Sequence, residues 1–241
     1  MKRVLLGMSF LGAAALAHAE TQVFVTDFDT TIPVEISAGT ATLTGVQGYS
    51  GLGPAGNQFG GTFLRSATGN IVTLTLTGLP EHSAINLDFL FAAIDSLDGT
   101  GTFPSGDFFN VTLDGVSVFR ESFANALPSQ IQSYVPPPDV ELARHADLGF
   151  SGPGSFYTDS AYNLGADPVF HNLAHSGTQA TFTFQIEGVG IQDLNDESWA
   201  MDNLRISVTA VPEPSTFVLA LVGLGILVFA RTAKVRAGPS T

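Results

Sequence analysis

The chain has 241 residues, a length that suits one domain of up to about 200 residues with additional segments. Apolar residues make up 44% of it, and its 26 Gly and 13 Pro fall well short of the share that marks low-complexity disorder, so a packed core can form. The formal net charge of −13 excludes electrostatically driven binding to nucleic acid. The absence of cysteine excludes a disulfide framework and a thiol enzyme.

The first 19 residues predict a secretory signal peptide. A charged start at Lys2 and Arg3 is followed by an apolar run over 4–16 and by an Ala-His-Ala sequence at 17–19. We therefore expect export across the inner membrane and a mature chain that begins at Glu20.

Runs of alternating apolar and polar residues dominate the segment 20–210. They are rich in Val, Thr, Phe and Ile, and Gly, Asn, Asp and Pro gather between them, which predicts β-strands joined by turns. The clearest runs are 22–28, 71–77, 85–91, 109–113, 116–119, 180–187 and 199–208. Asp114-Gly115 separates two of these runs and predicts a two-residue hairpin, because a type I′ turn needs positive φ at both positions.

The body is predicted to be all-β. Residues 139–147, after the prolines at 136–138, could make two helical turns, but no part of the body keeps a helical period with caps. Many short strands over roughly 190 residues, without a repeat of 40 to 50, predict a two-sheet antiparallel sandwich of jelly-roll type. The irregular stretch 123–173 is the predicted main insertion, where function often lies.

The body is also strongly acidic. Residues 20–210 hold four arginines, no lysine and 21 carboxylates, a net charge of 4 minus 21, or −17, and such a surface tends to hold cations. Calcium binds carboxylates that converge from separate loops. Two candidate calcium clusters are Asp27 and Asp29 with Asp202, and Asp95, Asp98 and Asp107 with Asp193, Asp196 and Glu197 as partners. The alternatives left open are solvated carboxylates and Asx turns at strand ends, or catalysis.

Aromatic and histidine side chains supply further candidates. Tyr49, Tyr157 and Tyr162 lie in loop-like stretches and are candidate ligand-binding residues, with packing as the alternative. Trp199 starts a strand and is expected in the core. The pair at 171 and 175 has the spacing of a zinc helix but lacks the Glu of H-E-x-x-H, so we expect loop hydrogen bonding from these histidines.

Several stretches of the body resemble the β-sandwich bodies of other exported bacterial proteins. The last of them, D-E-S-W-A-M-D-N-L from Asp196, is also similar to the closing strand of galactose-binding-like and carbohydrate-binding jelly rolls. This resemblance implies a sandwich and a structural calcium ion, but no particular sugar. The other stretches are V-Q-G-Y-S-G-L-G at 46–53, L-T-G-L-P-E-H at 76–82, L-D-F-L-F-A-A-I-D-S-L-D-G at 87–99 and F-F-N-V-T-L-D-G-V-S-V-F at 108–119.

The tail over 211–241 contains a Pro-Glu-Pro motif, an uncharged apolar stretch at 217–230 and a basic end. The apolar stretch predicts a single short transmembrane helix, with membrane contact over 216–230 and the basic end on the cytoplasmic side. The motif residues are Val211, Pro212, Glu213, Pro214, Ser215 and Thr216, and the basic residues are Arg231, Lys234 and Arg236.

This tail resembles the PEP-CTERM sorting signal of exported bacterial proteins. The resemblance implies recognition by an exosortase at the membrane of a Gram-negative bacterium, cleavage near the Pro-Glu-Pro motif, and release to the cell surface or extracellular matrix. The protein would be anchored in the membrane only transiently.

These observations together favour an exported, non-enzymatic β-sandwich protein of the cell surface or matrix, associated with exopolysaccharide and stabilised by calcium. The alternative is a secreted carbohydrate-active enzyme, a hydrolase or lyase, on the same fold. A groove that holds two carboxylates, one of them with a raised pKa, would distinguish the enzyme from the binding protein.

Overall fold

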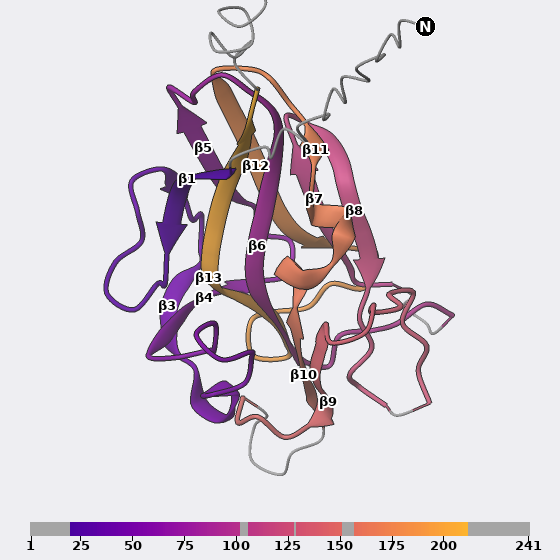
Figure 1. Cartoon of the computed structure of the whole chain (residues 1–241). Helices are drawn as coiled ribbons and strands as arrows, with labels where there is room; N and C mark the ends of the chain where they lie inside the picture. Colours follow the sequence, from indigo (N-terminus) through magenta and orange to yellow (C-terminus); the bar gives the residue numbers. More distant parts are fainter. Residues whose placement is uncertain (1–19, 102–105, 128, 151–156, 212–241) are drawn as a thin grey trace, which may run out of the picture. The chain divides into compact units, whose positions relative to one another are not determined.

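Two antiparallel β-sheets with one core between them form the body of the protein in the computed structural model (Figure 1). The structure describes residues 20–101, 106–127, 129–150 and 157–211. By its contacts, Glu20–Ala210 is a unit of its own. The predicted signal peptide and the tail from Pro212 onward lie outside the described residues. In the described ranges, no helix has the length and apolar character needed to cross a membrane.

The larger sheet is built around two central strands of 14 residues each, which pair antiparallel with one another. The central strands are β6 and β13, and each pairs with two further strands, one after the other, along its outer edge. β13 pairs with β1 and β4, and β6 pairs with β10 and β11. The strands of this sheet are β1 (Glu20–Thr26), β3 (Thr42–Gly45), β4 (Thr62–Ala67), β6 (His82–Asp95), β9 (Glu141–Ala146), β10 (Asp159–Asn163), β11 (Leu173–Ala174) and β13 (Glu197–Ala210).

The smaller sheet has five strands in the order β2-β5-β12-β7-β8. Its strands alternate as the sequence predicts, because every second side chain of β12 points into the core. The strands are β2 (Ile36–Ser37), β5 (Val72–Thr77), β7 (Phe108–Leu113), β8 (Val116–Ser122) and β12 (Gln179–Glu187), and three short 3₁₀ turns are η1 (Gln47–Tyr49), η2 (Leu164–Ala166) and η3 (Pro168–Phe170).

The predicted hairpin is confirmed. β7 and β8 pair antiparallel, and the two residues between them, Asp114 and Gly115, have φ values of 51° and 80°. The helical turns considered for 139–147 are wrong, because Asp139 has a φ of 66° and 141–146 form strand β9 against β10. Pairing with a neighbouring strand here outweighs the weak local preference for a helix.

The core between the sheets is rich in aromatic rings. Trp199 on β13 is completely buried, as expected, and its ring lies 5.3 Å from that of Phe109 on β7, which joins the two sheets. Phe91 on β6 lies 4.3 Å from Phe109. Each such side chain contributes about 1.5–3 kcal/mol by leaving water, so this layer supplies much of the stability of the sandwich.

A second apolar cluster covers part of the outer face of the larger sheet. Successive side chains of a strand point to opposite faces, so Phe91 joins the inner core while Leu90 joins this outer cluster. Tyr49 and Phe59 from the segment between β3 and β4 cover it. Gly48 makes the close approach possible, because a Cβ there would lie 2.7 Å from the carbonyl oxygen of Leu148.

Candidate functional site

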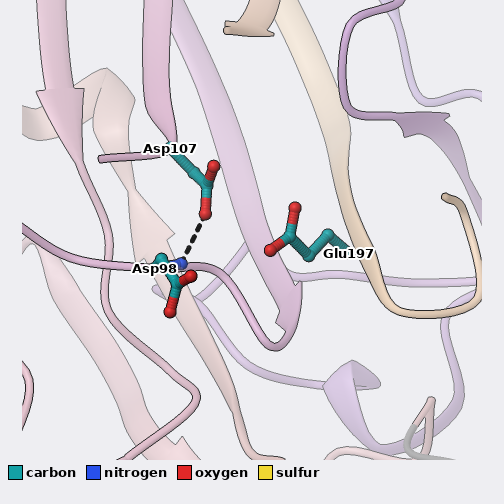
Figure 2. Close-up of side chains that lie close together, drawn as sticks. All are labelled: Asp98, Asp107 and Glu197. Atoms are coloured by element: carbon teal, nitrogen blue, oxygen red, sulfur yellow. Dashed lines mark hydrogen bonds between the residues drawn. The ribbon is translucent and has the colours of Figure 1, made fainter. Parts of the chain in front are cut away.

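Three carboxylates meet at the end of the sandwich where β6 finishes and β7 and β13 begin. Asp98 lies in the connection after β6, Asp107 directly precedes β7, and Glu197 is the first residue of β13. One carboxylate oxygen from each lies within 4.8 Å of the others. Figure 2 shows Asp107 and Glu197 directing their carboxylates toward the space between the strands. Within the described residues, this is the one group of three acidic or imidazole side chains so close together.

Hydrogen bonds hold each of the three carboxylates in place. The backbone N–H of Asp98 donates to Oδ2 of Asp107 at 2.6 Å, and the N–H of Asp107 donates to the carbonyl of Asp98 at 2.9 Å. Gln192 donates to Glu197 from both its backbone and its side-chain amide, each at 3.0 Å. The side-chain amide of Gln130 donates to Asp98 at 2.6 Å. Gln130 and Gln192 were not identified from the sequence, because nothing in the local sequence distinguishes a loop glutamine that bonds to a carboxylate from one that faces solvent.

Burial changes the protonation of this group. Removal from water raises the pKa of Asp107 to about 6 and that of Glu197 to about 7, because the charged form loses its hydration. The neighbouring Asp98 carboxylate also raises the pKa of both groups, and the hydrogen bonds that they accept act in the opposite direction. The pair is therefore poised to hold a proton or a cation near neutral pH.

The predicted partners of this cluster are only partly brought together. Asp95 lies apart from it, where its carboxylate is 4.0 Å from the Arg65 guanidinium, and burial and the Asp159 charge raise its pKa to about 6. Asp193 accepts the backbone N–H of Asn195 within its own loop. Asp196 accepts hydrogen bonds from Ser96, whose hydroxyl donates to the Asp196 carboxylate and whose N–H donates to the Asp196 carbonyl. Glu197 is thus the predicted partner that reaches Asp98 and Asp107.

The other predicted cluster joins the first and last strands. β1 pairs with β13, as the calcium prediction required, and the charges of Asp27 and Asp29 raise the pKa of Asp202, although burial is the main cause of its rise to about 7. Asp202 accepts hydrogen bonds from the N–H groups of Gly60 and Asn203. Asp27 and Asp29 are both exposed. Asp27 accepts the backbone N–H of Asp29 in a tight turn, which is the alternative that the sequence left open, whereas Asp29 accepts the N–H of Thr62 at the start of β4.

The tyrosines predicted to bind a ligand do not share a surface. Tyr49 and Tyr162 are completely buried, which corrects the expectation that they present their rings to a ligand. Tyr49 is covered in the outer cluster and donates a hydrogen bond to the carbonyl of Ala93, and Tyr162 donates one to Gln132. Tyr157 is 37% exposed, so it alone of the three offers a ring to solvent.

The histidines serve hydrogen bonding, as expected. Nε2 of His171 lies 2.7 Å from the carbonyl of Gly165. His175 lies 2.7 Å from His82 through their ring nitrogens, and 3.2 Å from the carboxylate of Asp114 at the hairpin. Its partners account for both ring nitrogens, so a zinc site is not needed to explain the pair.

Two adjoining hollows lie along β1. One has a volume of about 250 Å³ and the other about 330 Å³, and both are lined by Val23, Phe24 and Glu35. Residues 76–80 complete the first hollow, and Pro33 lines the second. Glu35 is the single carboxylate that lines either one, so neither hollow has the paired acids of a glycosidase.

The end of the chain matches a known sorting signal. Residues 210–235 match the family described as the PEP-CTERM protein-sorting motif. The chain carries a PEP-CTERM motif. This motif marks the chain for secretion and for processing by an exosortase at the membrane, with a transient C-terminal anchor. Of the predicted motif residues, Val211 alone lies in the described part of the chain, where it is 40% exposed.

The sandwich body has a partial likeness to solved domains of carbohydrate-binding and glycosidase proteins. The catalytic domain of Agl-KA is 14% identical with a TM-score of 0.34, over 83% of this chain and 31% of that one. The CBM22-2 xylan-binding domain from Paenibacillus barcinonensis Xyn10C is 12% identical with a TM-score of 0.34, over 77% of this chain and 99% of that one. The chain therefore spans about a third of the first of these structures. No curated protein matches the chain.

Proposed function

We propose that the protein is a non-enzymatic β-sandwich module of the cell surface or extracellular matrix, where it associates with exopolysaccharide. An exosortase processes its tail during export. The body then acts as a folded acidic unit outside the cell, with binding rather than bond cleavage as its task.

The observation that carries this proposal is where the PEP-CTERM motif begins. The last strand of the body, β13, ends at Ala210, and the matched motif starts at residue 210. No part of the body's two sheets lies beyond that residue in the described chain. Cleavage near the Pro-Glu-Pro motif would therefore release the whole sandwich intact.

The placement of the acidic groups supports a non-enzymatic role. A carboxylic acid that cleaves a glycosidic bond needs both a raised pKa and contact with the substrate. The described carboxyls whose pKa is raised to about 6 or 7 are each about 1% exposed or less, so a polymer chain cannot reach them. They are Asp95, Asp107, Glu197 and Asp202.

The hollows along β1 are the surface that we assign to the polysaccharide. The partly exposed ring of Phe24 forms an apolar wall of both hollows. Glu35 supplies an exposed carboxylate that can accept hydrogen bonds from sugar hydroxyls. Sites for small polar ligands commonly combine an apolar wall with a few polar groups in this way.

The test is co-sedimentation of the secreted body with insoluble exopolysaccharide purified from the producing bacterium, followed by an assay for released sugar ends. We expect the body in the pellet and no release above the protein-free blank. Glu35→Gln should weaken binding about tenfold, because a charged hydrogen-bond partner is lost. Glu81→Gln, another exposed glutamate, is the matched control.

Two results would contradict the proposal. Release of reducing or unsaturated ends would make the protein an enzyme. A body that stays in the supernatant would remove the association with exopolysaccharide while leaving the export route untouched.

A further inference from the structure

Asp98 and Asp107 are close in the sequence and Glu197 is far from both, yet the carboxylates of all three lie close together at one end of the sandwich (Figure 2). Glu197 is completely buried and Asp107 is 1% exposed, while Asp98 is partly open to solvent. Two acidic side chains sealed from water at such short range repel each other strongly unless something positive lies between them.

No charged donor reaches the group through a hydrogen bond in the described chain. The donors are the backbone N–H groups of Asp98 and Gln192 and the side-chain amides of Gln130 and Gln192. All of them are neutral. They orient the carboxylates without balancing their charge, so the group keeps a net negative charge when it is ionised.

One buried oxygen of the group lacks a hydrogen-bond partner. Oδ1 of Asp107 is buried and receives no hydrogen bond, although its other oxygen accepts one from Asp98. Buried carboxylate oxygens in folded proteins are almost always paired, and an unpaired one needs an explanation such as an ion. The backbone of Gly188 closes one side, because a Cβ there would lie 3.4 Å from this oxygen.

We propose that Asp98, Asp107 and Glu197 bind one calcium ion that fastens the connection after β6 to the start of β13. Calcium–oxygen distances are about 2.3–2.6 Å, so three oxygens within 4.8 Å of one another can all contact one ion placed between them. Water entering on the open side of Asp98 supplies further ligands of the six to eight that calcium takes.

The ligand types select a hard cation. The group contains only oxygen donors, which calcium prefers, and neither imidazole nor thiolate, which zinc and copper prefer. The protein carries an export motif, and extracellular calcium modules work with dissociation constants of about 10⁻⁴–10⁻³ M. A site with two buried carboxylates and one half-exposed carboxylate fits that range.

The test compares the melting temperature of the body, Glu20–Ala210, which has its own sheets and core, in ~10 mM CaCl₂ and in chelator. We expect calcium to raise it by about 3–10 °C, as expected for a ligand well above its dissociation constant. Magnesium at the same concentration and NaCl at equal ionic strength should raise it far less. Calorimetric titration with CaCl₂ should give one site per chain.

Asp107→Asn should abolish the calcium response. The variant should be at least as stable as the parent in chelator, because it removes the unpaired charge and its amide can donate to Glu197. Should this variant fail to fold, Asp98→Asn is the second choice, since that side chain is half-exposed. Asp202→Asn is the matched control: it removes a buried aspartate on the same strand, β13, and should keep the full calcium response.

Three results would overturn the proposal. The first is an unchanged melting temperature in calcium, which would mean that Asp107 and Glu197 share a proton instead. The second is a calcium response that survives in both Asp107→Asn and Asp98→Asn, above all if Asp202→Asn removes it, since the ion would then join the first and last strands. The third is an equal response to magnesium.

Discussion

At the scale of single residues, Asp202 is an acidic group that the fold holds away from water. It lies in the middle of the larger sheet, is 1% exposed, and its pKa rises to about 7 mainly through burial. Two backbone N–H groups bond to it and oppose that rise. A carboxyl in this setting makes stability depend on pH.

The sign of that dependence follows from the direction of the shift. The folded protein holds the Asp202 proton more tightly than the unfolded chain does, so the stabilising effect is complete below the ordinary aspartate pKa of about 3.9. It is lost as the pH rises through about 7. In chelator, the melting temperature should fall between pH 5 and pH 8, and Asp202→Asn should reduce that fall by about 4–8 °C.

Asp139→Asn is the control for this measurement, because Asp139 is exposed and asparagine tolerates its positive φ. Its pH profile should follow that of the parent. An Asp202→Asn profile with the parent's slope would show that other buried acids govern the titration.

At the scale of elements, the hairpin between β7 and β8 offers a clean test of backbone conformation. Gly115 has a φ of 80°, and a Cβ placed there meets no atom within 4 Å. Gly115→Ala should therefore lower the free energy of unfolding only because alanine disfavours the left-handed conformation. We expect a loss of about 1–2 kcal/mol, measured by urea denaturation.

Gly45→Ala provides the matched comparison, since a Cβ there also meets no atom within 4 Å and the φ is not positive. We expect its unfolding free energy to stay within about 0.5 kcal/mol of the parent value. Equal losses in the two variants would mean that the turn geometry does not limit stability.

The same scale explains what the sequence could predict. Strands such as β5 and β12 alternate in polarity, and that period alone places one face in the core. The outer cluster has no such periodic pattern in the sequence. Tyr49 lies in a Gly-rich stretch, and this stretch packs over β6 through contacts between residues distant in the sequence. A prediction from the local sequence therefore placed the Tyr49 ring at the surface.

The candidate site also has one feature that the sequence could predict and one that it could not. Proximity of the first and last strands followed from the fold class, and it is confirmed by the pairing of β1 with β13. The separation of Asp95 from Asp98 could not be predicted, because it depends on Asp95 adopting a φ of 63° beside Arg65. Three residues along a chain are enough to turn two carboxylates toward different neighbours.

At the scale of the whole molecule, the body and the sorting motif are consecutive, so they can be altered separately. Changing Pro212, Glu213 and Pro214 to alanine leaves the sandwich untouched while removing the motif's core. We expect the variant to stay in the membrane fraction, whereas the parent reaches the medium or cell surface, as measured by fractionation and immunoblotting. Alanines in place of Pro136 and Pro137 give a control that also loses two prolines, and unchanged release of the tail variant would refute the assignment.

The position of β13 also bears on when the body can fold. This strand holds the last 14 residues of the body, yet it lies at the centre of the larger sheet, in contact with β1, β4 and β6. A chain led across a membrane by its N-terminus lacks its central strand until almost the whole body has crossed, and long-range strand pairing of this kind is slow. The larger sheet is therefore complete only when the residues next to the sorting motif are free to pair, which makes the last segment of the body the one on which its folding depends.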